Sequence, residues 1–131
     1  MNTQDRGPQG RGEPALRVVP RPADANAGGD IFGGWVLSQM DIAGGTVASQ
    51  RAKGRTVTVA IEAMTFHRPI YVGDLVSLYA RIDRVGTTSI AIHIETLVRR
   101  RDEPEEITVT EGSFVYVAVA GEGRPRPLPP E

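Results

Sequence analysis

Residues 26–48 read NAGGDIFGGWVLSQMDIAGGTVA, and this stretch decides the fold of the chain. From Ile31 onward, apolar residues recur at spacings of three and four, which is typical of a helix with one face against a core. The apolar positions of this face are Ile31, Trp35, Val36, Met40, Ala43 and Val47. Lys53 and Gly54 form the usual end of a helix, so the sequence predicts one long helix between Ile31 and these residues.

The first turn of this helix contains two glycines, Gly33 and Gly34. Because glycine has no side chain, the backbone N–H groups there stay uncovered, and bare amides at a helix N-terminus form an anion or oxyanion site. Asp41 is the carboxylate in the helix interior. It shares a face with Gly34, Leu37, Ser38, Gly44, Gly45 and Ala48. Four of these six are glycine or alanine, which predicts close packing and a tight, partly dry place for the carboxylate.

The spacing between the Gly33 amide and the Asp41 carboxylate decides whether one chain can bring both groups to the same reacting atom. Gly33 and Asp41 are eight residues apart, which is about 12 Å along a helix, so one chain cannot bring both to the same atom. If two copies of the helix lie antiparallel across a two-fold axis near Leu37, Gly33 of one chain meets Asp41 of the other. A bare amide and a buried carboxylate at one reacting centre would form an acyl-transfer constellation.

The residues alone also allow ordinary structural explanations. An aspartate in a helix is often a solvated or salt-bridged surface residue, which is the alternative for Asp41. Gly33 and Gly34 could serve close packing. Asn26 could be a turn or N-cap residue, because asparagine favours both positions.

Composition and charge restrict the class of protein. A chain of 131 residues is long enough for a single domain. The net charge of -1 gives no electrostatic reason to expect nucleic acid or an anionic membrane as a partner. Without cysteine there is no disulfide framework, no thiolate nucleophile and no cysteine metal site. The N-terminus lacks the apolar core of a signal peptide and no run approaches a membrane span, so we expect a soluble, cytoplasmic protein.

The rest of the chain reads as strands between two tails. Eight of the ten prolines lie near the chain ends, which predicts mobile tails at residues 1–13 and 122–131 around one domain at residues 14–121. Alternating or short apolar runs predict strands at residues 15–19, 57–66, 75–85, 90–97 and 107–120. Within the second of these, Val57, Val59, Ile61 and Ala63 are expected on one face.

The order of elements predicts an α+β fold. Short connections favour antiparallel pairing, and one helix can cover only one face of a five-stranded sheet. We therefore expect a curled antiparallel five-stranded sheet wrapped around one long central helix. An edge strand would remain open and the outer face carries apolar side chains, so self-association is expected.

The segment from Asn26 to Asp41 resembles the motif of the hotdog-fold acyl-CoA thioesterases, in particular their YciA-like branch. Further similar segments follow in the family's order at residues 56–59, 64–66, 68–69, 72–74 and 86–90. The resemblance covers residues 17–127. It implies a hotdog dimer, commonly assembled further into a hexamer as a trimer of dimers. It also implies hydrolysis of acyl-CoA to a carboxylic acid and CoA, with no metal and no organic cofactor.

The resemblance assigns roles by matching positions. Asp41 is the catalytic carboxylate, acting as general base on water or as nucleophile. Gly33 supplies the N–H that polarises the thioester carbonyl, and Asn26 offers a donor and an acceptor to orient water or the carbonyl. The family places these groups across the dimer interface. The further positions assigned to binding CoA or the acyl group are Gly34, Thr58, Arg68, Pro69, Gly86, Thr87, Thr88 and Ser89.

Two other functions stay open. Hotdog-fold enoyl-CoA hydratases and dehydratases use a histidine paired with a carboxylate, but the helical segment has no histidine, and His67 and His93 fall in strand or turn context. A non-catalytic acyl-CoA-binding sensor would bind the same ligand. It would also need an output element, which the proline- and glycine-rich N-terminus does not resemble.

Overall fold

The computed structural model describes residues 11–131. A short strand, β1 (Leu16–Val18), and a 3-10 turn (Pro22–Asp24) lead into the long helix α1 (Gly33–Ala52). Four strands follow: β2 (Thr56–Phe66), β3 (Leu75–Val85), β4 (Ser89–Arg99) and β5 (Glu106–Ala118). The predicted order of one strand, one long helix and four strands is confirmed. Lys53 has left-handed backbone angles after the last helical residue, as expected of a helix end.

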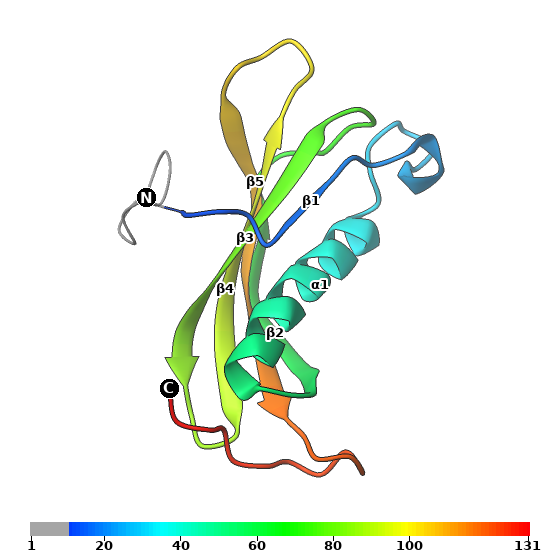
Figure 1. Ribbon diagram of the computed structural model, residues 1–131. Helices are drawn as coiled ribbons and strands as arrows, with labels where there is room; N and C mark the ends of the chain where they lie inside the picture. The colour runs from blue at the N-terminus through cyan, green and yellow to red at the C-terminus, as the bar shows by residue number, and fades with distance from the viewer. Residues whose placement is uncertain (1–10) are drawn as a thin grey trace.

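The five strands form one antiparallel sheet in the order β1-β3-β4-β5-β2. Figure 1 shows the sheet curling around α1, which lies along one face. Buried side chains of β4 and β5, among them Ile92, Ile94 and Phe114, pack against this helix. The predicted α+β architecture is confirmed. No helix within residues 11–131 is both long enough and apolar enough to cross a membrane.

The buried face of α1 differs in part from the predicted one. Val36, Met40 and Ala43 are buried as expected, whereas Trp35 and Val47 are only half-buried. The other buried positions of the helix are Gly44, Ala48 and Ala52. Positions buried at every fourth residue drift around a helix of 3.6 residues per turn, so the contact stripe winds along the axis and follows the twisted sheet.

Strand β2 departs from the strict alternation that its sequence predicts. Its pairing with β5 shifts register between Thr58 and Ala60, and again between Glu62 and Thr65. Ala63, in the second irregularity, has a φ of 51°. Each irregularity inserts an extra residue and exchanges the two faces of the strand. The expectation of one continuous apolar face over residues 57–63 is therefore wrong.

The C-terminal segment, residues 122–131, packs against the domain, so the expectation of a mobile tail is wrong there. The amide of Leu128 donates to the carbonyl of Thr87 (2.9 Å), and the Leu128 side chain packs against the core. Arg51 of α1 donates to the carbonyl of Pro129 (2.6 Å). Because proline restricts the chain before it folds, these prolines reduce the entropy cost of ordering the segment. Residues 1–10 of the expected N-terminal tail lie outside the described part of the chain.

Arg126 of this segment closes the C-terminal end of α1. Its Nη2 donates to the carbonyl of Ala52 (2.8 Å) and its Nε to the carbonyl of Val119 (3.2 Å). The last carbonyls of a helix have no partner inside it, so a cationic donor there is stabilising. We expect Arg126→Met, which keeps the aliphatic stem, to lower the free energy of unfolding by about 1–2 kcal/mol.

Urea unfolding measures this effect. The matched control is Arg124→Met, because Arg124 is exposed and its side chain has no partner among residues 11–131. Equal unfolding midpoints for the two variants would contradict the role of Arg126 at the helix end.

Candidate functional site

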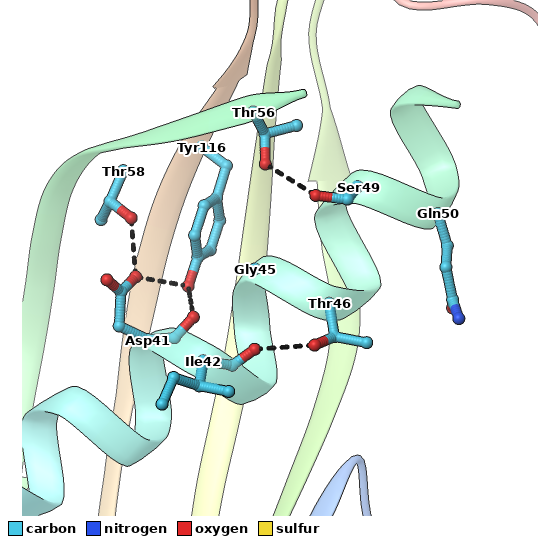
Figure 2. A pocket seen from close by; sticks show the side chains of 9 residues that line it. All are labelled: Asp41, Ile42, Gly45, Thr46, Ser49, Gln50, Thr56, Thr58 and Tyr116. Carbon is cyan, nitrogen blue, oxygen red and sulfur yellow. Dashed lines mark hydrogen bonds between the residues drawn. The ribbon is translucent and has the colours of Figure 1, made fainter. Parts of the chain in front are cut away.

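Asp41 lies in the middle of α1, on the side of the helix that faces β2 and β5. Its Oδ1 accepts one hydrogen bond from Thr58 Oγ1 (2.6 Å) and one from Tyr116 Oη (3.0 Å). Tyr116 Oη also approaches the backbone carbonyl of Asp41 (3.1 Å). Figure 2 shows both hydroxyls converging on the same carboxylate oxygen. The other oxygen, Oδ2, has no hydrogen-bond partner among the residues that the structure describes.

A pocket of about 550 Å³ opens beside this carboxylate. One wall is the solvent side of α1 with Ile42, Thr46 and Ser49, and the other is the start of β2 with Thr58 (Figure 2). The volume is in the range of small-molecule sites, and most of the polar lining consists of hydroxyl groups. The arrangement offers a half-buried carboxylate with one free oxygen to a molecule entering the pocket.

Tyr116 acts as a hydrogen-bond donor in this site and does not ionise there. Burial raises the pKa of its phenol far above the ordinary value, and the charge of Asp41 and the hydrogen bond to it raise that pKa further, against a smaller opposite effect of Thr58. The phenol is therefore protonated at any physiological pH. Sequence reasoning missed this residue, which lies in a predicted strand 75 positions from Asp41. The available signal was that a buried tyrosine hydroxyl usually needs a partner.

Gly44 allows Tyr116 to come this close to the helix. A Cβ at Gly44 would lie 2.3 Å from Tyr116 Oη and 2.7 Å from Ile94 Cδ1. The predicted close packing on the face of Asp41 is therefore confirmed at Gly44. It is wrong at Gly34, where an added Cβ would meet no atom within 4 Å.

The N-terminus of α1 is open, as the two glycines predict. Gly33 and Gly34 are exposed, and the N-cap residue Phe32 makes no side-chain capping bond. The amides of Trp35 and Val36 donate to the carbonyl of Phe32. Among residues 11–131 the amides of Gly33 and Gly34 donate to no acceptor, so the prediction of bare amides at this helix end is confirmed.

Asn26 organises the loop in front of α1. Its Oδ1 accepts hydrogen bonds from the amides of Gly28 (2.9 Å) and Asp30 (3.2 Å). The structural explanation as a turn residue is thus confirmed. The acceptor oxygen is thus engaged by the loop. The Nδ2 donor has no partner in the described part of the chain.

The remaining predicted positions do not line the Asp41 pocket, apart from Thr58. The carbonyl of Pro69 accepts a hydrogen bond from Arg100 (3.2 Å), and the Arg68 side chain is exposed. Residues 86–89 form the turn between β3 and β4, closed by a bond from the Gly86 amide to the Ser89 carbonyl (2.8 Å). One chain alone therefore does not bring these positions together with Asp41.

The two histidines meet a carboxylate elsewhere on the sheet. Nε2 of His67 lies 3.0 Å from Glu111 Oε2, and Nε2 of His93 lies 3.7 Å from Glu111 Oε1. Neither histidine lines the Asp41 pocket. Within residues 11–131 no group of three or more histidine, aspartate or glutamate side chains is arranged to hold a metal ion.

Comparison with known proteins places this site in a family. Residues 28–105, from the loop before α1 to the loop after β4, match the thioesterase superfamily. The chain belongs to the thioesterase superfamily. This thioesterase is 54% identical to the acyl-CoA thioester hydrolase YciA of Salmonella typhimurium, over 98% of both chains. It is 52% identical to the enzyme of the same name from Escherichia coli, over 100% of both chains.

Solved structures agree with the fold of this thioesterase. The hexameric thioesterase of Yersinia pestis superposes with a TM-score of 0.87 at 49% identity, over 91% of this chain and 97% of that one. The hexameric hotdog fold thioesterase of Campylobacter jejuni superposes with a TM-score of 0.86 at 38% identity, over 91% and 92% of the two chains. The predicted hotdog fold and thioesterase family are confirmed.

Proposed function

We propose that this thioesterase hydrolyses acyl-CoA to a carboxylic acid and CoA, at a site that two copies of the chain build together. The observation that carries the proposal is the placement of Asp41, with one carboxylate oxygen anchored and the other free beside a pocket. Relatives more than half identical over nearly the whole chain are named acyl-CoA thioester hydrolases, which supports the choice of substrate. The reaction uses neither metal nor organic cofactor, and CoA is its product.

In this proposal the thioester carbonyl docks at the N-terminus of α1. The free amide of Gly33 donates to the carbonyl oxygen as negative charge develops there, with the Gly34 amide beside it. Asp41 of the other chain acts through its free oxygen, either by taking a proton from the water that attacks the carbonyl carbon, or by attacking that carbon itself to form a mixed anhydride that water then hydrolyses. Asn26 donates a hydrogen bond through Nδ2 to the water or to the thioester carbonyl and so orients it. CoA leaves as a thiolate, and because a thiol has a pKa of about 8.5, no dedicated general acid is needed.

The need for two chains follows from the helix. Gly33 and Asp41 belong to the same uninterrupted helix, so about 12 Å separates them along its axis. Antiparallel pairing of two copies of α1 across a two-fold axis removes this separation, because each Gly33 then approaches the Asp41 of the other chain. Each dimer would hold two equivalent sites.

Strand β2 is the surface that supports such pairing. It lies at the edge of the sheet with β5 as its neighbour, and its other edge is open over eleven residues. Val59, Ile61 and Phe66 on this strand are 55%, 46% and 51% exposed. The Phe66 ring comes within 3.8 Å of the position that a Cβ on Gly33 would take, so this apolar strand adjoins the helix N-terminus. Unpaired edges and exposed apolar side chains favour association with a second copy.

We infer the higher assembly from the solved relatives, and the remaining CoA contacts from exposed residues of this chain. The thioesterases of Yersinia pestis and Campylobacter jejuni are hexameric, and we extend this to a trimer of dimers here. Arg68 is an exposed cation able to pair with a CoA phosphate. Pro69 beside it and the turn at residues 86–89 complete the proposed CoA contacts. A cytoplasmic location stays a prediction.

The alternatives differ in what they do to the substrate. An enoyl-CoA hydratase needs a histidine at the reacting carbon, and no histidine lines the Asp41 pocket within one chain. A sensor would bind acyl-CoA and release it unchanged. Release of free thiol over an acyl-CoA chain-length series, with Asp41→Ala as control, separates all three functions. Stable binding without thiol release would favour the sensor, and conversion of enoyl-CoA without thiol release would favour the hydratase.

Shared sites can be tested by complementation. Asp41→Ala and Asn26→Ala should each be nearly inactive when expressed alone. Mixed dimers carrying one chain of each, isolated with two different tags after co-expression, should recover about half of the wild-type activity, because one of their two sites is intact. Thiol release at saturating acyl-CoA measures the recovery. Mixed dimers no more active than the parents would show that both residues act within one chain.

A further inference from the structure

Tyr116 ties the carboxylate of Asp41 to the middle of the sheet. Its side chain is 1% exposed and stacks on Phe114, with ring centroids 6.5 Å apart and an interplanar angle of 18°. Its hydroxyl reaches both the carbonyl and Oδ1 of Asp41. A rigid, fully packed ring therefore holds this donor at a fixed place beside the helix.

Thr58, the second donor to the same oxygen, is held less firmly than Tyr116. Thr58 lies on the edge strand β2, next to the register shift between Thr58 and Ala60, and its side chain is exposed. Tyr116 lies on β5, which has a strand on either side. The tyrosine, more than the threonine, therefore fixes the carboxylate relative to the core.

Gly44 makes room for the Tyr116 hydroxyl. Glycine destabilises the interior of a helix, yet Gly44 occupies the centre of α1, where an added Cβ would lie 2.3 Å from Tyr116 Oη. Ile94 Cδ1 (2.7 Å) and Tyr116 Cζ (3.0 Å) are the next nearest atoms, so the hydroxyl that points at Asp41 is the group for which this glycine matters most.

We propose that Tyr116 is a positioning residue: by binding Oδ1 it fixes the Asp41 side chain so that Oδ2 faces the reacting centre. This inference rests on the proposed hydrolysis by Asp41. Oδ1 receives both hydrogen bonds, so the free lone pairs of Oδ2 are the ones presented to water or to the thioester carbon. In this role the Tyr116 hydroxyl binds Asp41 and transfers no proton.

Tyr116→Phe removes the hydroxyl and keeps the ring. The freed carboxylate loses its fixed direction, so kcat should fall about tenfold, while KM should change less than twofold because the binding surfaces are untouched. A loss confined to kcat identifies a group that acts on the reacting carboxylate and not on substrate binding.

Tyr79→Phe is the matched control. Tyr79 is also buried in the sheet, on β3, and its hydroxyl bonds to Glu106 (3.2 Å) away from the Asp41 pocket. This variant loses the same atom, so a general effect of removing a buried hydroxyl should appear in both. We expect kcat and KM of Tyr79→Phe to match those of the wild type.

A readout independent of turnover completes the experiment. The ¹³C NMR resonance of the Asp41 carboxyl carbon at neutral pH, assigned with Asp41→Asn, should shift in Tyr116→Phe and stay unchanged in Tyr79→Phe. An unmoved resonance, or an active Tyr116→Phe with unchanged kcat, would overturn the inference. If the wild type releases no thiol from any acyl-CoA, the proposed function fails. The resonance then decides separately whether Tyr116 binds the carboxylate.

Discussion

Asp41→Asn is expected to lower kcat for acyl-CoA hydrolysis by about a thousandfold. Asparagine has nearly the same shape, and its Oδ1 can still accept the bonds that Thr58 and Tyr116 donate to Asp41. The neutral amide can neither accept a proton from water at neutral pH nor attack a carbonyl. KM should change little, because the surfaces that bind the substrate remain. Steady-state thiol-release kinetics at saturating acyl-CoA measure the loss.

Asp83→Asn provides the control for this substitution. Asp83 is exposed on β3 and its side chain has no partner among residues 11–131, so kcat should stay within twofold of the wild type. Thermal unfolding of both variants shows whether the fold is intact. A folded Asp41→Asn that keeps more than about a tenth of wild-type kcat would exclude Asp41 as base or nucleophile.

Gly44→Ala is expected to lower the free energy of unfolding by about 3 kcal/mol. The added methyl group would lie 2.3 Å from Tyr116 Oη and 2.7 Å from Ile94 Cδ1. Both neighbours are fully packed, so either the phenol leaves Asp41 or α1 moves off the sheet. Activity should fall as well, since either response displaces the carboxylate. Urea unfolding followed by circular dichroism measures the change in stability.

Gly45→Ala separates this steric effect from the intrinsic preference of helices for alanine. A Cβ at Gly45 would lie 3.8 Å from Tyr116 Cε2, which is an ordinary contact. Alanine in place of glycine favours a helix by about 1 kcal/mol, so this variant should be as stable as the wild type or more stable. Equal destabilisation by Gly44→Ala and Gly45→Ala would refute the close contact. In a Tyr116→Phe background, Gly44→Ala should cost less, because the nearest clashing atom is gone.

Local sequence patterns were sufficient to predict most of the fold. The strand Leu75–Val85 was predicted with both of its ends, and Lys53 ends the helix as expected. These boundaries depend on local sequence patterns: the alternation of apolar and polar residues, the glycine turns and the left-handed cap of the helix. The apolar face of β2 was not predictable in this way, because its register shifts depend on how it pairs with β5, a strand about fifty residues later.

Long-range contacts explain the other differences. The prolines after residue 121 resemble a mobile tail in composition, and the sequence gives no sign that Arg51 meets Pro129 or that Arg126 meets Ala52. The residues of the candidate site also fall into those that local sequence predicts and those that only long-range contacts bring to the site. Asn26, Gly33 and Asp41 lie in one short stretch and could be identified together, whereas Tyr116 reaches Asp41 only through folding of the whole sheet.

The open edge of β2 has a consequence for the life of the chain before assembly. In the proposed dimer, a newly synthesised copy would expose the open edge of this eleven-residue strand, together with Val59, Ile61 and Phe66, until it meets a second copy. Such a strand can recruit unrelated chains into aggregates. In the proposed dimer, rapid mutual capture of newly made subunits therefore protects solubility as well as completing the active sites, and prolonged dilution would work against both.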